Sequence, residues 1–356
     1  MKLAKRISRI SPSITLGLNA RTLELRSQGR DIVAFGVGEP DIDTPTPVCE
    51  AGKRAIDDCI VRYTATAGTP ELIEAICGYV ESVYGLSYET NCVMASAGGK
   101  QVLYNAILAT AGRGDEFILP VPYWTSYPEF ISLADATTVL VETVAENQFK
   151  MTPEALDKAI TPRSTALLLN SPSNPTGVAY SRRDLEELGE VLKPHDIWIL
   201  SDDIYCALLF DGHEFATMAQ IPGFKDRTII INGVSKTWSM TGWRIGFAAG
   251  PRELIAGMTK IQDHSTSCPN AIGQKAAAEA LRQGHSLTAE WVSSLGPRRD
   301  LMLSLATAIP GVTAVTPQGA FYLFVDVTAY LGKPGGPSST LELAEGLLVD
   351  GGVGTI

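Results

Sequence analysis

Short apolar runs of four or five residues recur along the middle of the chain, with stretches of helical spacing between most of them. They are rich in Val, Ile and Leu and read as continuously apolar, which is typical of strands buried on both faces. The runs predict seven strands, at residues 92–95, 116–119, 137–141, 165–169, 197–200, 228–231 and 245–248. Helical patterns lie at 101–111, 153–160 and 182–192. This alternation predicts an α/β fold with a mainly parallel, seven-stranded sheet between helices.

The two ends of the chain differ from this middle and predict a second, smaller α+β domain. Within the C-terminal part, residues 311–327 read as two strands around a glycine turn, and residues 341–350 read as a helix. Thr152 and Ser181 precede helical patterns as hydroxyl caps. The predicted division is an N-terminal arm with part of the small domain at 1–45, a large domain at 46–280, and the rest of the small domain at 281–356.

The 356 residues are enough for two domains, and 45% hydrophobic against 19% charged residues provide a sizeable core. A formal net charge of −10 without a clustered basic face argues against nucleic-acid binding. No apolar run approaches the roughly 20 residues that span a bilayer, and none follows the basic start as a secretory signal would. Six cysteines without a CxxC pair and four scattered histidines predict reduced thiols, a cytoplasmic protein and no metal site.

One lysine, Lys236, follows the apolar run at 228–231 in a stretch with few other charges. It is either a solvated surface amine or a buried one, and its apolar surroundings favour burial. Because burial disfavours the charged form, the pKa of a buried lysine falls, and the neutral amine can form a Schiff base. Arg244, eight residues later, would lower this pKa further or bind an anion such as phosphate.

Polar residues also follow two other predicted strands. The stretch LLLNSPSNPTG at 167–177 ends in a loop that either faces a ligand crevice or forms a simple Asn-Pro turn. Asp202 follows the run at 197–200, and a carboxylate at the end of a buried strand can pair with a cationic ring nitrogen. Tyr205 adds a phenol nearby. The adjacent Asp203 is expected to be the N-cap of a following helix, while Asp202 faces the site.

Two further segments suit a flat, phosphorylated cofactor. In MASAGGKQVLYNAIL, residues 94–108, two glycines lead from a strand into a helix, whose N-terminal N–H groups can bind an anion. In LPVPYWTSYPEF, residues 119–130, aromatic side chains follow another strand, where one would stack on a ring or join the core. A lysine nucleophile, a strand-end acid, a phenol, an aromatic ring, a phosphate site and an arginine together match the requirements of pyridoxal 5′-phosphate.

With these segments in this order, the chain resembles class I aminotransferases of the fold-type-I family that uses pyridoxal phosphate. More narrowly, it resembles the bacterial aspartate aminotransferase subgroup, which also contains prephenate aminotransferases. The matching stretches are GVGEPDIDTPTPV, RYTATAGTPELIEAI, ASAGGKQVLYN, DEFILPVPYWTSYPE, NSPSNPTG, SDDIY, VSKTWSMTGWRIGF and PQGAFYLFVDV. They cover nearly the whole chain and imply the family's fold, its transaminase activity and its cofactor.

The resemblance implies a role for each matching residue. Lys236 would hold the cofactor aldehyde as a Schiff base and later carry a proton between the substrate Cα and the cofactor. Asp202 would pair with the ring nitrogen, and Tyr205 would contact the ring oxygen. Further cofactor contacts are expected from Asn174 at the ring oxygen, Trp124 stacked on the ring, and Gly99, Lys100, Ser235 and Arg244 at the phosphate.

The same resemblance implies a homodimer, because Tyr63 would reach the phosphate of the neighbouring subunit. Gly38, Trp124 and Asn174 would lie against the substrate. Lys100, which directly follows the two glycines, would bind the distal carboxylate of an acidic substrate. This favours aspartate or glutamate as amino donor, with 2-oxoglutarate or oxaloacetate as acceptor, in a ping-pong reaction.

Alternatives remain for the substrate and for turnover. Arg9 and the SPSIT segment at 11–15 resemble the family's mobile arm that closes over the site, and an arginine there also suits prephenate or an aromatic substrate. Family members continue past residue 356 to an arginine that clamps the substrate α-carboxylate. The sequence is therefore expected to be truncated, or else to bind pyridoxal phosphate with impaired catalysis. Another activity on this fold, such as a C–S lyase, is disfavoured by the Gly-Gly-Lys pattern.

Overall fold

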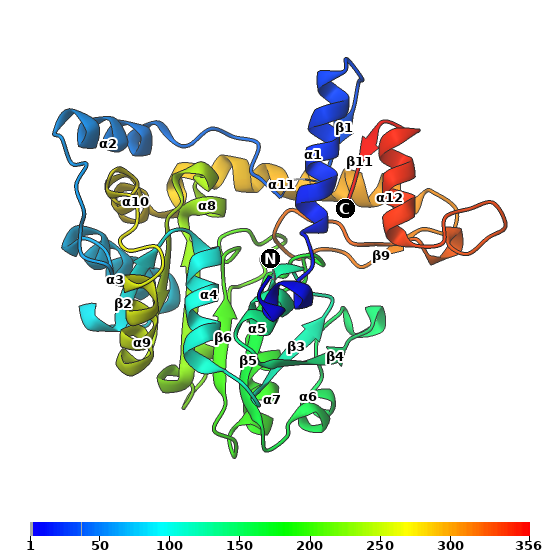
Figure 1. Cartoon of the computed structure of the whole chain (residues 1–356). Coiled ribbons are helices and arrows are strands. Elements are labelled where there is room, and N and C mark those ends of the chain that lie inside the picture. Colours follow the sequence, from blue (N-terminus) through cyan, green and yellow to red (C-terminus); the bar gives the residue numbers. More distant parts are fainter. Residues whose placement is uncertain (1–2, 37) are drawn as a thin grey trace.

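The computed structural model describes residues 3–36 and 38–356, and a seven-stranded sheet lies at its centre (Figure 1). The strand order across the sheet is β2-β8-β7-β6-β5-β3-β4. From β7 to β4 all neighbours are parallel, whereas β8 is antiparallel to both β2 and β7. The strands are β2 (Val93–Ser96), β3 (Glu116–Val121), β4 (Thr137–Glu142), β5 (Ser164–Asn170), β6 (Trp198–Asp202), β7 (Thr228–Gly233) and β8 (Gly246–Ala249).

All seven predicted strands are present, and their ends differ from the predicted ends by at most two residues. The prediction of an α/β fold with a mainly parallel central sheet is therefore confirmed. Every residue of β7 and of β8 is buried. Because helices cover the sheet on both sides, the apolar residues of these strands form continuous runs, such as Ile229–Ile231 in β7, rather than alternating with polar ones.

Helices cover both faces of the sheet. One face is covered by α4 (Gly99–Thr110), α5 (Ser126–Leu133) and α9 (Arg252–Asp263). The other face is covered by α3 (Pro70–Tyr84), α6 (Pro153–Ala159), α7 (Arg182–Leu192) and α10 (Ala271–Gln283). Successive side chains of one strand serve opposite faces, so that Leu168 of β5 packs with the first group and Leu167 with the second.

The helices predicted at 101–111, 153–160 and 182–192 correspond to α4, α6 and α7. Both predicted caps are formed. Thr152 Oγ1 accepts a hydrogen bond from Ala155 N at 3.2 Å, and Ser181 forms a capping box with Asp184 at the start of α7. Since α4 begins at Gly99, directly after the paired glycines, its first N–H groups lie at the edge of the sheet where β2 ends.

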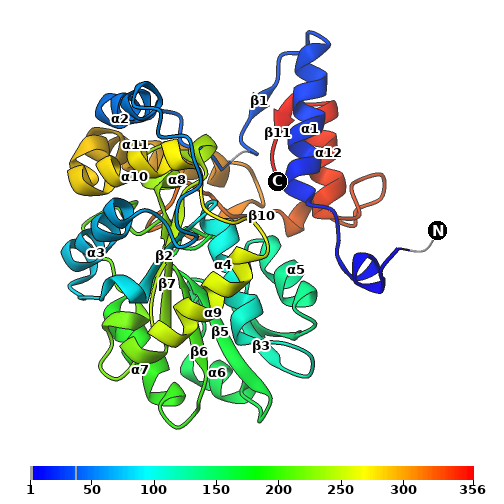
Figure 2. The same cartoon turned by 60° about the vertical axis from the view of Figure 1, so that its left-hand side comes forward.

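The two ends of the chain pack against each other. α1 (Ile14–Ser27) and α12 (Thr340–Val349) lie side by side (Figures 1 and 2). β1 (Val33–Ala34) pairs in parallel with β11 (Val353–Gly354). A small apolar cluster joins them, formed by Leu18, Leu25, Ile32, Ala344 and Leu348. The residue boundaries predicted for the domains, at 45 and 280, remain a prediction.

The predicted strand pair at 311–327 is present only as two short strands. β9 (Thr313–Ala314) and β10 (Val325–Asp326) are antiparallel, with two residues each. The residues between them leave the pair because their backbone bonds elsewhere: Ala320 N donates to Leu208 O, and Gln318 N donates to Gly177 O, both at 2.8 Å. The two predicted strands are therefore present, but each is much shorter than the predicted stretch, and a long irregular segment joins them.

The fold also contains the helices α2 (Thr46–Asp57), α8 (Val234–Thr237) and α11 (Ala289–Thr307). The last of these belongs to the C-terminal part of the chain and precedes β9. Within residues 3–36 and 38–356, no helix combines the length and the apolar composition needed to cross a membrane.

Gly246 of β8 lies directly on the start of α4. A Cβ atom there would be 2.8 Å from Gly99 Cα and closer still to Gly99 N, and both are backbone atoms that can move only with the helix. We predict that Gly246→Ala lowers the free energy of unfolding by about 1–3 kcal/mol, which is the usual effect of overpacking. Urea denaturation measures this difference.

Gly78→Ala in α3 is the matched control, because a Cβ added at Gly78 meets nothing within 4 Å. This control should gain up to about 1 kcal/mol through the higher helix propensity of alanine. Equal effects of the two substitutions would contradict the contact described between β8 and α4.

Candidate active site

The carboxyl ends of three neighbouring parallel strands meet at one edge of the sheet. β5 ends at Asn170, β6 ends at Asp202, and β7 runs directly into α8, which carries Lys236. The register places Asn170 opposite Asp202, and Asp202 opposite Ile231. In open α/β sheets this edge forms the ligand crevice, so these side chains define the candidate site.

The Lys236 side chain is surrounded by protein, and its Nζ donates a hydrogen bond to Gly38 O at 2.5 Å. Burial lowers the pKa of Lys236 to about 8, with Glu39 and Asp202 opposing the shift and Arg244 adding to it. Close to neutral pH, a measurable fraction of this side chain is therefore the neutral, nucleophilic amine.

The Asp202 side chain is buried and accepts two hydrogen bonds. Tyr127 OH donates to its Oδ2 at 2.7 Å, and Ile204 N lies 3.4 Å from its Oδ1. Burial raises the pKa of Asp202 to about 6, against these two hydrogen bonds and the Lys236 charge. Sequence analysis missed Tyr127, although it stands one helical turn after Trp124 in the same aromatic stretch.

The prediction that Asp203 is the N-cap of a helix was wrong, because the chain makes turns after β6 and no helix begins there. The Asp203 side chain is fully buried instead. Ser201 Oγ donates to its Oδ1 at 2.8 Å, while its Oδ2 has no hydrogen-bond partner among the described residues. Burial raises the pKa of Asp203 well above its usual value, and the neighbouring Asp202 adds to the rise.

Tyr205 is buried beside the same strand tips. Its hydroxyl lies 2.6 Å from the hydroxyl of Tyr322, which belongs to the C-terminal part of the chain. Burial raises the pKa of Tyr205 well above 10, and hydrogen bonding by the Asn174 side chain offsets part of the rise. Tyr322 escaped sequence analysis because it lies 117 positions after Tyr205, and only the fold brings the two phenols together.

The guanidinium group of Arg244 lies against Gly98, the residue before α4. Gly98 has a φ of 91°, which favours glycine, and a Cβ there would lie only 2.9 Å from Arg244 Cζ. Arg244 is itself left-handed, with a φ of 57°, and its Nη1 donates to Thr241 O at 2.9 Å. A helix N-terminus beside a guanidinium group favours the binding of an anion.

Two more predicted residues lie at this end of α4. Lys100 is the second residue of the helix, and its Nζ lies 4.7 Å from the centre of the Trp124 ring. Burial lowers the pKa of Lys100, and Arg244 lowers it further. Ser235 is buried in α8 directly before Lys236. The chain thus gathers positive charge, a flat ring and a helix N-terminus in one place.

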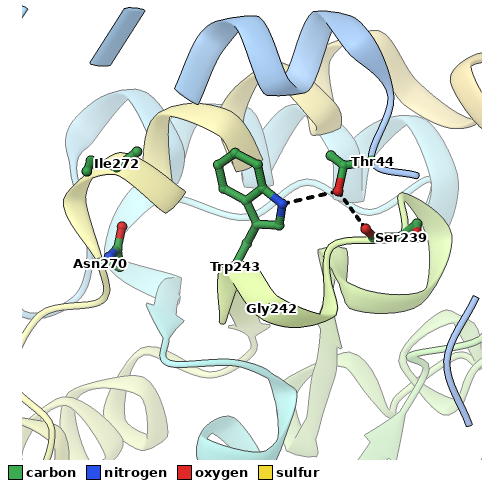
Figure 3. Close-up of a pocket in the computed structure, with 6 residues that line it drawn as sticks. All are labelled: Thr44, Ser239, Gly242, Trp243, Asn270 and Ile272. Atoms are coloured by element: carbon green, nitrogen blue, oxygen red, sulfur yellow. Dashed lines mark hydrogen bonds between the residues drawn. The ribbon is translucent and has the colours of Figure 1, made fainter. Parts of the chain in front are cut away.

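Tyr63 lies apart from these residues within the subunit. Its side chain is 92% exposed and lines a cavity of about 740 Å³ with Arg62 and segment 268–272. An adjoining cavity of about 360 Å³ is lined by Thr44, Ser239, Gly242, Trp243, Asn270 and Ile272 (Figure 3). Neither cavity contains Lys236 or Asp202 in its wall, so the structure does not bring Tyr63 together with these two residues.

Arg9 is paired away from the strand tips. Its guanidinium forms an ion pair with Asp135, which follows the end of α5. Ser11 N donates to Glu129 of α5 at 3.0 Å. The N-terminal arm thus rests on α5 in this structure, and the predicted closure of the arm over the site remains a prediction.

The model of the aminotransferase class I and II family matches residues 30–354. With this match, the fold and the residues at the strand tips, the chain belongs to the class I and II aminotransferase family. It is 48% identical to the aspartate/prephenate aminotransferase of Cereibacter sphaeroides, over 99% of this chain and 90% of that protein. It is 45% identical to an aspartate aminotransferase of Rhizobium meliloti, over 93% of this chain and 81% of that protein.

Solved structures agree with this assignment. The aspartate aminotransferase of Rhizobium meliloti superposes with a TM-score of 0.93 at 43% identity, over 99% of this chain and 90% of that one. The Thermus thermophilus aspartate aminotransferase with maleate gives 0.92 at 39% identity, over 99% and 91%. The chain is therefore an aminotransferase similar to the aspartate aminotransferases, and enzymes of this family use pyridoxal 5′-phosphate.

The residues at the strand tips fit this cofactor. The buried Asp202 carboxyl suits a cationic ring nitrogen, and the Lys236 amine suits an aldehyde. Arg244 lies near enough to Lys100 to lower its pKa, so an anion bound at the start of α4 would relieve repulsion between two cations.

The lowered pKa of Lys236 leads to a prediction for the cofactor-free protein. Only the neutral amine reacts with fluorodinitrobenzene, so labelling of Lys236 should rise with pH and reach half its maximum at about pH 8. Peptide mapping after short exposures from pH 6 to 11 measures this. Lys53 is the internal control, because it is exposed and Glu50 raises its pKa. Equal pH profiles for both lysines would contradict the buried setting of Lys236.

The raised pKa of Asp203 leads to a prediction for stability. In the unfolded chain this carboxyl ionises above about pH 4, whereas in the folded chain it stays protonated to higher pH. Between these two pKa values folding takes up a proton. The contribution of Asp203 to the free energy of unfolding thus falls as pH rises, by up to about 1.4 kcal/mol per pH unit.

Asp203→Asn removes this proton uptake while keeping the shape of the protonated acid. The melting temperature of the variant relative to the parent should therefore rise between pH 5 and pH 8. Circular dichroism melts at several pH values measure it. Asp157→Asn, at an exposed position of α6, is the control and should show a constant difference. A constant difference for both variants would refute the protonated state of Asp203.

Proposed function

We propose that this chain transfers the amino group of aspartate or glutamate to 2-oxoglutarate or oxaloacetate in a ping-pong reaction. The observation that carries the proposal is the Lys100 ammonium. It lies beside the Trp124 ring, and no carboxylate of the described residues perturbs its pKa. Such a cation is available to the distal carboxylate of an acidic substrate. The maleate bound to the Thermus thermophilus relative is also a dicarboxylate.

The bound cofactor supplies a ring that accepts the electrons left at the substrate Cα when a proton departs. In this proposal, Lys236 Nζ takes that proton and later returns one, which requires the neutral amine that its lowered pKa provides. Asp202, held by Tyr127 OH, keeps the ring nitrogen protonated. Tyr205 and Asn174 hold the ring oxygen. The catalytic residues are thus Lys236, Asp202 and Tyr205.

The remaining proposed contacts hold the cofactor and the substrate in place. Trp124 stacks on the ring, and Gly38, with Asn174 and Trp124, lies against the substrate. The phosphate is bound by the backbone of Gly99 and Lys100 and by the side chains of Ser235 and Arg244. These residues lie at the starts of α4 and α8 and beside them.

We also propose that the active molecule is a homodimer. Tyr63 and Val61 are 92% and 61% exposed at a hollow surface, and burying them against a second copy removes this apolar area from water. Tyr63 of one subunit would then reach the phosphate in the other. Each site is complete only when two copies associate.

A second candidate substrate is prephenate. It is favoured by the relative of Cereibacter sphaeroides, which is named an aspartate/prephenate aminotransferase and shares 48% of its residues with this chain. Prephenate is an acidic 2-oxo acid with a distal carboxylate, so it would use the same Lys100 contact. Assaying prephenate beside 2-oxoglutarate as amino acceptor separates the two candidates.

The test is the half-reaction of the cofactor-loaded protein with single amino acids. Aspartate and glutamate should convert the absorption of the bound cofactor to that of its amine form. In Lys100→Met, kcat/KM for both should fall about 10- to 100-fold, as expected for a lost charge-assisted hydrogen bond, while alanine is unaffected. Stopped-flow spectra measure these rates.

Lys53→Met, which removes an exposed lysine of α2 paired with Glu50, is the charge-matched control and should react like the parent. If aspartate and glutamate leave the spectrum of the parent protein unchanged, the proposed function is wrong. The result would then favour the alternative that the chain binds pyridoxal phosphate with impaired catalysis. If Lys100→Met weakens alanine and aspartate equally, the substrate assignment fails while amino transfer stands.

A further inference from the structure

Tyr322 lies on the segment between β9 and β10 and meets the strand tips from the C-terminal side. Its hydroxyl is 2.6 Å from Tyr205 OH, and the two rings pack edge to face with centres 5.6 Å apart. A Cβ added at Gly38 would press on the same hydroxyl and lie 3.2 Å from Tyr322 Cζ. Tyr322 therefore contacts both Tyr205 and the residue whose carbonyl binds Lys236.

The position of Tyr322 is set by the backbone. Ala320 N donates to Leu208 O, and Gly319 N donates to Gly177 O, both at 2.8 Å, so the segment is held on the large domain. Gly177, with a φ of 69°, permits this approach, because a Cβ there would lie 2.6 Å from Pro317 Cβ. These backbone contacts hold the segment that carries Tyr322 and so fix the position of its ring beside the Tyr205 ring.

The hydrogen of each phenol decides what this contact does. A phenol donates one hydrogen bond and can accept others. If Tyr205 donated to Tyr322, it would have no hydrogen left for the ring oxygen of the cofactor. If Tyr322 donates to Tyr205, the Tyr205 hydrogen remains available. In the described part of the chain, Tyr205 is the one hydrogen-bond partner of the Tyr322 hydroxyl, so Tyr322 uses its own hydrogen only when it donates to Tyr205.

We propose that Tyr322 is a positioning residue that donates its hydroxyl hydrogen to Tyr205 and thereby turns the Tyr205 hydrogen toward the cofactor ring oxygen. The proposal rests on the proposed role of Tyr205. Two phenols in series also polarise each other, so Tyr205 becomes a stronger donor than a lone tyrosine. Tyr322 thus acts on the cofactor through Tyr205 without touching it.

Loss of the Tyr322 donor should shift the apparent pKa of the bound cofactor in one direction, upward. In Tyr322→Phe the ring still packs on Tyr205, but Tyr205 becomes a weaker donor to the ring oxygen. More negative charge then stays on that oxygen, and the proton beside it is held more tightly. The apparent pKa of the bound cofactor, followed by its visible absorption, should therefore rise by about 0.4–1 unit. We expect kcat to fall several-fold with little change in KM.

The experiment is a spectroscopic pH titration of four cofactor-loaded proteins: the parent, Tyr322→Phe, Tyr205→Phe and the double variant. Tyr205→Phe should shift the titration more than Tyr322→Phe, and the double variant should match Tyr205→Phe because Tyr322 acts only through Tyr205. Tyr330→Phe is the control. Its hydroxyl donates to Pro310 O at 2.7 Å in the same part of the chain, so its loss should leave the titration unchanged.

The outcomes distinguish a failure of the role inferred for Tyr322 from a failure of the role proposed for Tyr205. A shift in Tyr205→Phe without one in Tyr322→Phe would overturn the inference and leave the proposed function intact, as would additive shifts in the double variant. No shift in Tyr205→Phe would mean that the role of Tyr205 is wrong. A lower melting temperature of Tyr322→Phe with an unchanged titration would show a packing role alone. If that variant does not fold, Tyr322→Met removes the same donor, and the same shift is expected.

Discussion

The site depends on an amine and a carboxyl that the fold removes from water together at neighbouring strand tips. Burial acts on the two in opposite directions, raising the pKa of Asp202 to about 6 and lowering that of Lys236 to about 8. The negative charge of Asp202 stabilises the Lys236 ammonium, and the ammonium stabilises the Asp202 carboxylate. The protonation of each group therefore depends on that of the other. In the proposed function, a cationic ring nitrogen paired with Asp202 would weaken the attraction between Asp202 and the Lys236 ammonium, and this would favour the neutral, nucleophilic amine.

The backbone makes this arrangement possible at a single edge. Parallel order from β7 to β4 places the ends of β5, β6 and β7 together, while the antiparallel β8 returns the chain along β2. That return brings Gly246 against the start of α4, close to where Arg244 lies on Gly98. One sheet edge thus presents a carboxyl and an amine at its centre, with a helix N-terminus and a guanidinium beside them. This separation of charge matches a ring with a cationic nitrogen and an anionic phosphate.

Sequence alone predicted the sheet well, because each strand contains a short run rich in Val, Ile and Leu, and most of these runs are buried. It also singled out Lys236 and Asp202 as polar residues at strand ends, and the structure places both side chains there, while their roles remain predictions. It failed where a partner comes from elsewhere in the chain, as with Tyr127 on Asp202 and Tyr322 on Tyr205. It failed at Asp203 too, because an acid after a strand reads as a helix cap, and only burial shows otherwise.

Segments from the two ends of the chain supply the last contacts at the strand tips. Lys236 bonds to Gly38 O, which follows β1, while Tyr322 from the segment before β10 bonds to Tyr205. β1 is paired with β11, and Phe35 N donates to Gly354 O at 2.7 Å, so the N-terminal contact is tied to the C-terminal helix and strand. The Tyr322 segment is held separately, because Ala320 N donates to Leu208 O and Gly319 N donates to Gly177 O. The amine contact and the phenol contact therefore depend on different backbone hydrogen bonds.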